Sequence, residues 1–251
     1  MMFSKKYFDE ILDSIEDDDM YEFADKLLET IPKYVYEVSA SSTGKFHPDY
    51  TKGEGGLARH TCAVVRLLNY TFQIECMNHW SKKERDILRI AAMMHDSRKS
   101  GSQEDYERNK YTKHEHPLLA AEVVRSVKGC GIISDSDIEL IAQTIESHMG
   151  QWNVSDHSPI VLPKPETELQ KMLHWADYLA SRKDIEIQFE IPKNTKNISV
   201  STADWKFPFG KYKNMTFDEV LDYDKSYLIW LRDKASMDIR EPLKSFLNNM
   251  P

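Results

Sequence analysis

The most constraining feature of this chain is an apolar helical run that ends in the pair His95-Asp96. Ser81 and Glu84 match a capping box, in which the serine caps the start of a helix and the glutamate reaches back to it. Apolar residues then recur at helical spacing up to the pair, at Ile87, Leu88, Ala91, Ala92 and Met94. The pattern predicts a core helix that brings an imidazole and a carboxylate together at its C-terminal end.

Other segments repeat the helical spacing of apolar residues. They are 8–15, 21–31, a helix that starts near Leu57 after a glycine-rich loop, a helix that ends near His148, and 166–182. Ser136 and Glu139 match a second capping box, which predicts that the helix leading to His148 begins there. The fold class expected for most of the chain is therefore mainly α.

Two further side chains suit a metal ion. His60 lies in the helix after the glycine-rich loop, and Asp177 lies on the inward side of 166–182, where an unpaired carboxylate is costly to bury. Taken singly, His60 is explained as a packed core histidine and Asp177 as a salt bridge. Taken with His95 and Asp96, they predict a site for a divalent transition metal, since imidazole nitrogens and carboxylate oxygens suit Mn²⁺, Fe²⁺, Co²⁺, Ni²⁺ or Zn²⁺.

Composition excludes several other classes of protein. The chain has 251 residues, 41% of them hydrophobic and 29% charged, and no stretch approaches the roughly 20 apolar residues of a membrane span. An acidic N-terminal segment argues against a signal peptide and favours a cytoplasmic location by default.

The net charge of −8 argues against broad adhesion to nucleic acid. The three cysteines form no CxxC pair, which indicates that they are packing residues. P-loop and GxSxG motifs are missing from the sequence.

In this order, His60, His95-Asp96 and Asp177 resemble the H…HD…D signature of the HD-domain phosphohydrolases, over roughly residues 40–185. The resemblance implies a helical HD-domain bundle that cleaves phosphoester bonds with one or two divalent metal ions. Asp96 would bridge the two ions.

Two more histidines, His116 in HEHPLLAAEVV and His148 in IESHMG, are similar to those that hold a second metal in HD enzymes. His114 competes with His116, but Pro117 suits the first turn of the next helix and favours His116.

The stretches GGLARHT, HEHPLLAAEVV and LPKPETELQKMLHWADYLASR are especially similar to the bacterial HD-domain 3′→5′ exoribonucleases, whose OB-fold has no counterpart in these residues. The motif HDSRKSG keeps Lys99 but has Arg98 where glycine is common. We expect Asp96 and Lys99 to be catalytic, Lys99 by offsetting charge on the phosphate. Further candidates for contact with the substrate are Arg59, Arg98, Lys113, Arg182 and His47, although solvated surface charge explains the cations equally well.

Beyond Asp184 the pattern changes from helical to alternating, which predicts a strand at 185–190 and a second at 198–201. We expect two domains, 1–195 and 204–251. The second resembles the FGKYKG-type module at the C-terminus of exodeoxyribonuclease X and of several phage proteins, and is expected to be a small α+β module. Asn214 replaces the usual glycine, which a turn tolerates. Its basic and aromatic residues suit nucleic-acid binding, but packing is favoured for Phe217 and Trp230.

These observations predict a metal-dependent phosphohydrolase that acts on a nucleotide or single-stranded nucleic acid. Hydrolysis of a 3′-terminal phosphodiester by an exonuclease is the preferred version. One alternative is a nucleotidase or cyclic-nucleotide phosphodiesterase, and another is a non-catalytic protein that binds nucleotide or nucleic acid. No membrane partner is expected, and the oligomeric state is unknown from the sequence.

Overall fold

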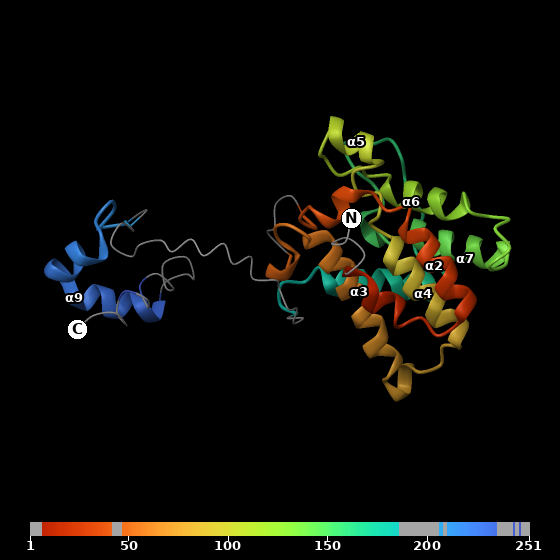
Figure 1. Cartoon of the computed structure of the whole chain (residues 1–251), viewed down its shortest axis with the longest axis horizontal. Coiled ribbons are helices and arrows are strands. Elements are labelled where there is room, and N and C mark those ends of the chain that lie inside the picture. Colours follow the sequence, from red (N-terminus) through yellow and green to blue (C-terminus); the bar gives the residue numbers. More distant parts are fainter. Residues whose placement is uncertain are drawn as a thin grey trace. The chain divides into compact units, whose positions relative to one another are not determined.

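The computed structural model describes residues 7–41, 47–185, 206–207, 210–234, 243 and 246. The chain forms two compact units, Met1–Ile191 and Pro192–Pro251. In the first unit the helices are α1 (Asp9–Leu12), α2 (Asp18–Leu28), α3 (Gly56–Phe72), α4 (Lys82–Met94), α5 (Gln103–Arg108), α6 (His116–Arg125), α7 (Asp135–Glu146) and α8 (Glu168–Ala180). Short 3₁₀ helices lie between them: η2 (Lys33–Tyr36), η3 (Asp49–Thr51), η4 (Glu75–Met77) and η5 (Gly150–Trp152). The predicted helical bundle is confirmed (Figure 1).

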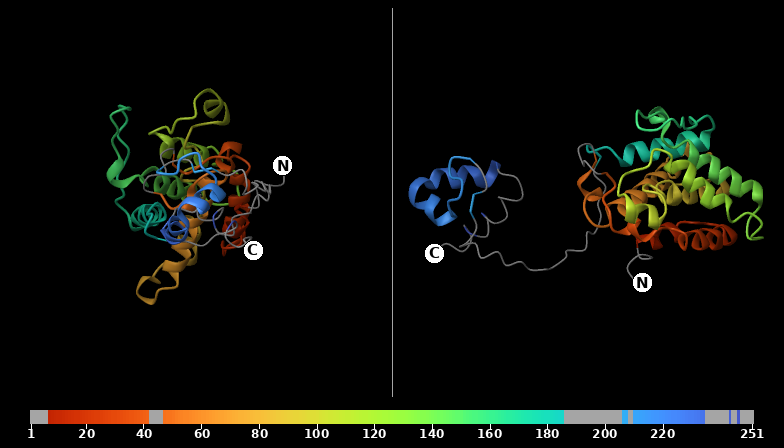
Figure 2. Two further views of the ribbon diagram at one scale, coloured as in Figure 1. Left: turned by 90° about the vertical axis from the view of Figure 1, so that its left-hand side faces the viewer. Right: turned by 90° about the horizontal axis from the view of Figure 1, so that it is seen from above.

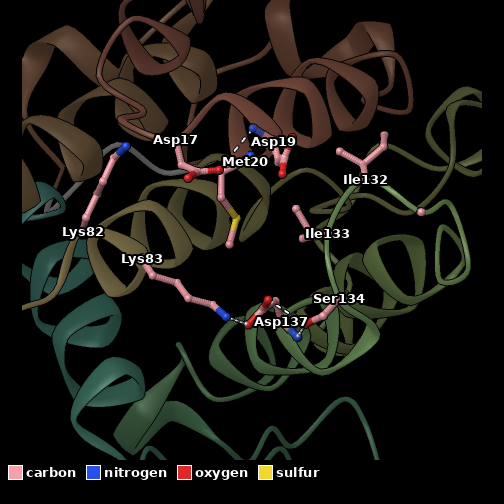
Figure 3. A pocket seen from close by; sticks show the side chains of 10 residues that line it. Asp17, Asp19, Met20, Lys82, Lys83, Ile132, Ile133, Ser134 and Asp137 are labelled. Carbon is pink, nitrogen blue, oxygen red and sulfur yellow. Dashed lines mark hydrogen bonds and ion pairs between the residues drawn. The ribbon is translucent and has the colours of Figure 1, made fainter.

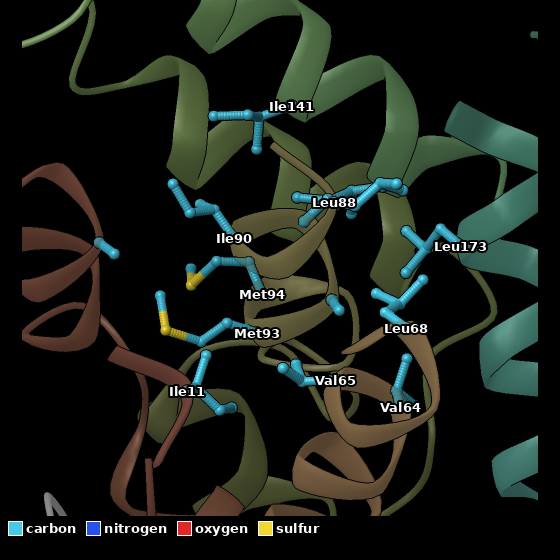
Figure 4. Close-up of a cluster of buried hydrophobic side chains, with 14 of the residues drawn as sticks. Ile11, Val64, Val65, Leu68, Leu88, Ile90, Met93, Met94, Ile141 and Leu173 are labelled. Atoms are coloured by element: carbon cyan, nitrogen blue, oxygen red, sulfur yellow. The ribbon is translucent and has the colours of Figure 1, made fainter. Parts of the chain in front are cut away.

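Helix α4 is the centre of this bundle. Every residue from Asp86 to Met94 is buried, and the helix packs against α2, α3, α7 and α8. Figure 4 shows side chains of α4 among those of α7 and α8, and the right-hand view of Figure 2 shows α2 and α8 on opposite sides of the bundle. The second half of α4, residues 90–94, is apolar on every side, and such a helical segment is stable only inside a protein. The predicted core helix is therefore confirmed, and its C-terminal end is surrounded by other helices.

The capping box at the start of α4 is also confirmed. Ser81 Oγ accepts a hydrogen bond from the Glu84 amide at 3.2 Å, and the Glu84 carboxylate accepts one from the Ser81 amide at 2.8 Å. The second predicted capping box is wrong. Helix α7 begins earlier, because Ser134 accepts from the Asp137 amide at 3.2 Å. Glu139 instead pairs with Arg125 at the end of α6, which leaves its carboxylate unavailable for a cap.

A buried carboxylate ties the α1–α2 connection to the central helix. Asp86, fully buried in α4, accepts hydrogen bonds from the backbone amides of Glu16 and Asp17, both at 3.0 Å, and from Arg89 Nη1 at 2.8 Å. Arg85 and Arg89 also bind the Glu16 carboxylate, and the hydrogen bond from Arg85 is the main reason that the pKa of Glu16 falls to about 2. This network fixes α2 against α4 through polar contacts as well as apolar ones.

The second unit has its own small core. Helix α9 (Phe217–Lys234) is kinked at Asp224, and an antiparallel bridge joins Lys206 to Thr216. Asn214 has φ +68°, the left-handed conformation that asparagine tolerates better than most residues, which fits its place in a glycine position. Phe217 is buried as predicted. The packing prediction for Trp230 is wrong, because its side chain is 56% exposed on α9.

The strand predictions for residues 185–190 and 198–201 lie outside the described residues, apart from Ile185. No helix in the described part of the chain combines the length and the apolar character needed to cross a bilayer.

Candidate metal centre

The predicted metal ligands come from separate helices and lie together in one buried cluster. His60 lies on α3, His95 and Asp96 directly follow α4, and His116 begins α6. His148 follows the end of α7, and Asp177 lies on α8. All six side chains are buried except that of Asp177, which is 20% exposed. The exposed edge of Asp177 marks a side from which solvent reaches the cluster.

One set of ligand atoms surrounds Asp96 Oδ2 and Asp177. His60 Nε2 lies 3.0 Å from Asp177 Oδ1 and 3.9 Å from Asp96 Oδ2. His95 Nε2 lies 3.8 Å and 3.7 Å from the same two oxygens. Donor atoms around a single ion, each about 2.0–2.2 Å from it, lie roughly 3–3.6 Å apart. The separations are therefore close to those of ligands that share one ion.

A second set surrounds the other oxygen of the same carboxylate. Asp96 Oδ1 lies 3.0 Å from His116 Nε2 and 3.9 Å from His148 Nε2. The two imidazole nitrogens are themselves 3.3 Å apart. Asp96 thus presents Oδ2 to His60 and His95 and Oδ1 to the other two histidines, so each of its oxygens could contact a different ion.

Backbone carbonyls orient three of the four imidazoles. The Nδ1 atoms of His95, His116 and His148 lie 2.7, 2.7 and 2.8 Å from the carbonyl oxygens of residues three positions earlier. A carbonyl only accepts, so Nδ1 carries the proton and Nε2 keeps its lone pair for a metal ion. His60 differs, because its Nδ1 has no hydrogen-bond partner within the described structure.

The positions of the nitrogen and oxygen donor atoms are compatible with a bound divalent metal ion. With Nδ1 protonated on both rings, the lone pairs of His116 Nε2 and His148 Nε2 face each other at 3.3 Å, which a cation or a shared proton between them would relieve. His95 Nε2 is buried without any hydrogen-bond partner in the described residues, and a metal would satisfy it. Triplets that could hold an ion are His60, His95 and Asp177, and His95, Asp96 and His148.

Lys99 reaches the same cluster. Its Nζ atom lies 2.6 Å from Asp96 Oδ2, and the lysine side chain is 19% exposed. Burial by itself raises the pKa of the Asp96 carboxyl, but Lys99 and His95 hold that pKa well below its usual range. Asp96 is therefore ionised near neutral pH, and Lys99 places a positive charge beside the ligand cluster.

His47 is also near the cluster, with its ring centroid 6.3 Å from that of His60. Burial, together with the neighbouring His60 and Lys99, lowers the pKa of His47 to about 4. His47 is therefore neutral near pH 7 and can accept or donate a hydrogen bond at the exposed edge of the site.

The four other predicted cations have different neighbours. Arg59 is buried and donates to the carbonyls of Tyr50, Glu54 and Lys52, so it holds the loop before α3. Arg98 donates to the carbonyl of Thr30. Both guanidinium groups are committed to backbone oxygens, and the structure does not bring them to the cluster.

Lys113 acts through its backbone, because its carbonyl accepts the hydrogen bond that orients His116, whereas its ammonium pairs with Asp105 at 3.1 Å. Arg182 lies over the ring of Tyr178, 4.4 Å from the ring centroid. Neither charged group contacts a predicted ligand.

Sequence reasoning missed the residues that position His148. His174 Nδ1 lies 2.6 Å from the His148 carbonyl oxygen and fixes the turn that follows α7. Gly150 in this turn has φ +55°, and a Cβ atom there would lie 2.3 Å from the His174 ring. Only glycine fits this close approach. The glycine after IESHM was a visible signal, but its partner is 24 residues later in the chain and could not be identified from spacing.

The buried imidazoles make the stability of the chain depend on pH. Burial lowers the pKa of His148 to about 3, whereas the unfolded chain restores it to about 6.5. Between these values the unfolded chain binds the proton and the folded chain does not, so stability is lost as the pH falls. We expect the free energy of unfolding in EDTA to fall between about pH 6.5 and 5, by at most about 1.4 kcal/mol per pH unit for each such histidine. Urea denaturation at several pH values measures this slope.

Replacing His148 by a neutral residue tests whether it causes this dependence of the free energy of unfolding on pH. His148→Gln should make the slope shallower, whereas His157→Gln, at an exposed position, should leave it unchanged. An identical slope in wild type and His148→Gln would contradict the assignment.

A helical bundle that brings imidazoles and carboxylates from separate helices to one buried cluster defines a metal-binding protein with the ligands of a metallohydrolase. A family model described as HD domain matches residues 57–182, which is half of the chain, and a model described as exodeoxyribonuclease X-like C-terminal matches residues 207–235. The chain belongs to the HD-domain family of metal-dependent phosphohydrolases. No curated protein and no solved structure gave a significant match.

Proposed function

We propose that the chain is a metal-dependent phosphodiesterase that degrades single-stranded nucleic acid from its 3′ end. The observation that carries the proposal is the double environment of Asp96, whose two oxygens face different pairs of histidines. A bridged pair of metal ions suits the displacement of a phosphodiester, because it stabilises both the attacking and the leaving oxygen. The exodeoxyribonuclease X-like module supports a nucleic-acid substrate over a free nucleotide.

The roles follow from the contacts. His60, His95, Asp96 and Asp177 are proposed ligands of one ion, and His116, His148 and Asp96 of the other. When bound, such ions polarise the phosphoryl oxygens and supply hydroxide near neutral pH. Nitrogen and oxygen donors without a thiolate suit Mn²⁺, Fe²⁺, Co²⁺, Ni²⁺ or Zn²⁺. Lys99 is proposed to neutralise charge on the phosphate, since its ammonium already lies against Asp96.

An aromatic stack on two of the ligand-bearing segments supports a substrate with bases. The Trp152 indole, 45% exposed, stacks on Tyr178 with ring centroids 5.8 Å apart and planes at 14°. The Arg182 guanidinium covers the Tyr178 ring. Trp152 follows His148 in the turn after α7, and Tyr178 directly follows Asp177 on α8. An exposed indole held by stacking is a surface on which a base can stack, whatever its identity.

A panel of substrates tests the proposal. With Mn²⁺ added, 5′-labelled single-stranded RNA or DNA is expected to shorten stepwise from the 3′ end, and EDTA is expected to stop the reaction. Strands with a 3′-terminal phosphorothioate linkage serve as matched controls and should resist the first step. Turnover of only mononucleotides or cyclic dinucleotides would instead indicate a nucleotidase or cyclic-nucleotide phosphodiesterase. Binding of the strands without turnover would indicate a non-catalytic protein.

A further inference from the structure

A cavity with both polar and apolar walls lies beside Lys99, which contacts the ligand cluster. It has a volume of about 180 Å³ and lies between the segment 38–41, Leu57 at the start of α3, and the segment 99–112. Lys99 lines the cavity, and its Nζ atom is also 2.6 Å from Asp96 Oδ2. Lys99 therefore belongs both to the wall of the cavity and to the surroundings of the candidate metal centre.

The cavity is positively charged in a chain of net charge −8. Lys99 and Lys110 contribute ammonium groups, and Ser39, Ser100 and Thr112 contribute hydroxyls, whereas no carboxylate is among the described residues that line the wall. Lys110 forms no ion pair within the described residues, and its Nζ lies over the Tyr106 ring, 5.5 Å from the centroid. The Lys99 ammonium is already paired with Asp96, so the Lys110 ammonium and the three hydroxyls are the groups of this wall that suit a phosphate.

One wall of the cavity is held in place by the core. The Tyr106 ring stacks on the buried Tyr34 ring, with centroids 4.6 Å apart and planes at 21°. Tyr34 Oη accepts a hydrogen bond from the Ser100 amide and donates one to the Gly101 carbonyl, both at 3.0 Å. A wall that is already ordered loses little entropy when a ligand binds.

Another cavity, at the starts of α2, α4 and α7, lacks this charge imbalance (Figure 3). It has a volume of about 580 Å³, but Lys83 pairs there with Asp137 at 2.7 Å. Asp17 and Asp19 add further negative charge to its wall. A phosphate would have to displace or approach these carboxylates.

We propose that the cavity beside Lys99 binds the phosphate group that neighbours the scissile phosphate of an oligonucleotide. Neighbouring phosphates are separated by one nucleoside, and Lys99 lies between the two places that they would occupy. The assignment rests on the proposed function, and it predicts that a substrate with at least two phosphate groups is hydrolysed more efficiently than one that carries the scissile phosphate alone. It disfavours a mononucleotide, which would leave the cavity empty.

The experiment compares dinucleotides that differ only in a terminal phosphate. UpU carries the scissile phosphate alone, whereas pUpU and UpUp add a second one at either end, and the deoxythymidine forms repeat the comparison for DNA. With the wild-type chain, one of the doubly phosphorylated forms should have a kcat/KM about tenfold above that of UpU, mainly through KM, as a hydrogen bond to a charged group contributes. Lys110→Gln should bring this ratio close to 1. Lys171→Gln, an exposed lysine of α8, should leave the ratio unchanged.

Protection of lysines from reductive methylation, read by mass spectrometry in EDTA, provides a measurement that needs no turnover. pUpU or UpUp should protect Lys110 but not Lys171, whereas UpU should protect neither. Equal kcat/KM values for all three dinucleotides would overturn the cavity assignment and leave the phosphohydrolase intact. Absence of hydrolysis would overturn the proposed function, and the protection of Lys110 would then decide the cavity assignment by itself.

Discussion

Replacing Asp96 by alanine is expected to reduce kcat/KM on a phosphodiester substrate by about 1000-fold or more, which corresponds to roughly 4 kcal/mol of lost transition-state stabilisation. Its two oxygens face both pairs of histidines, so one substitution removes a proposed ligand from each ion. The bound metal should fall together with the activity. Hydrolysis of a labelled strand and metal content by mass spectrometry, measured on the same Asp96→Ala preparation, check the prediction.

Two controls separate this effect from misfolding. Asp156→Ala removes an exposed carboxylate and should retain both metal and activity. The helical circular dichroism of Asp96→Ala should match that of the wild type, because the carboxylate lies at the end of α4 and not within its apolar packing. Full metal content in a correctly folded Asp96→Ala variant would contradict a bridging role.

The second large effect concerns stability. Asp86→Ala should lower the free energy of unfolding by about 3 kcal/mol or more, because the loss of a buried, hydrogen-bonded charge leaves its partners unsatisfied. These partners are the amides of Glu16 and Asp17 and the guanidinium of Arg89. Urea denaturation at pH 7 should show a lower midpoint with an unchanged slope.

Asp18→Ala is the matched control, since Asp18 is exposed at the start of α2 and has much less to lose. We expect a change within about 1 kcal/mol for this variant. Equal destabilisation by Asp86→Ala and Asp18→Ala would show that the polar network contributes little to the attachment of α2.

Local sequence rules were sufficient where neighbours in the chain decide the structure. The Ser81–Glu84 capping box and the apolar spacing that follows it depend on residues three and four positions apart, and both were predicted for α4. The same rule failed at Ser136 and Glu139, because Glu139 is bound by Arg125 from the preceding helix. A capping motif competes with tertiary ion pairs that a linear pattern does not contain.

Among the candidate site residues, imidazoles and carboxylates were easier to identify than cations. Several histidines and aspartates on the inward sides of core helices are, as a set, unusual enough to indicate a metal, and the predicted ligands all lie in one cluster. Arginines and lysines occur on most surfaces, so proximity in sequence was a poor guide for them: Lys99, which the family motif singled out, reaches the cluster, whereas Arg59 and Arg98 do not. The guanidinium groups of Arg59 and Arg98 donate hydrogen bonds to backbone carbonyls. The sequence did not reveal the positions of these carbonyls, because they depend on the conformation of the loops.

By itself the sequence determined the helical class and the central helix, because these depend on periodicity, and it indicated the candidate ligands through their chemical type and their resemblance to the HD-domain signature. Tertiary structure alone decided that Asp96 divides its oxygens between two pairs of histidines, that His174 holds the turn after α7, and that a lysine-lined cavity adjoins the site. These features join residues far apart in the chain, and their geometry arises only when α3, α4, α6, α7 and α8 pack around one core.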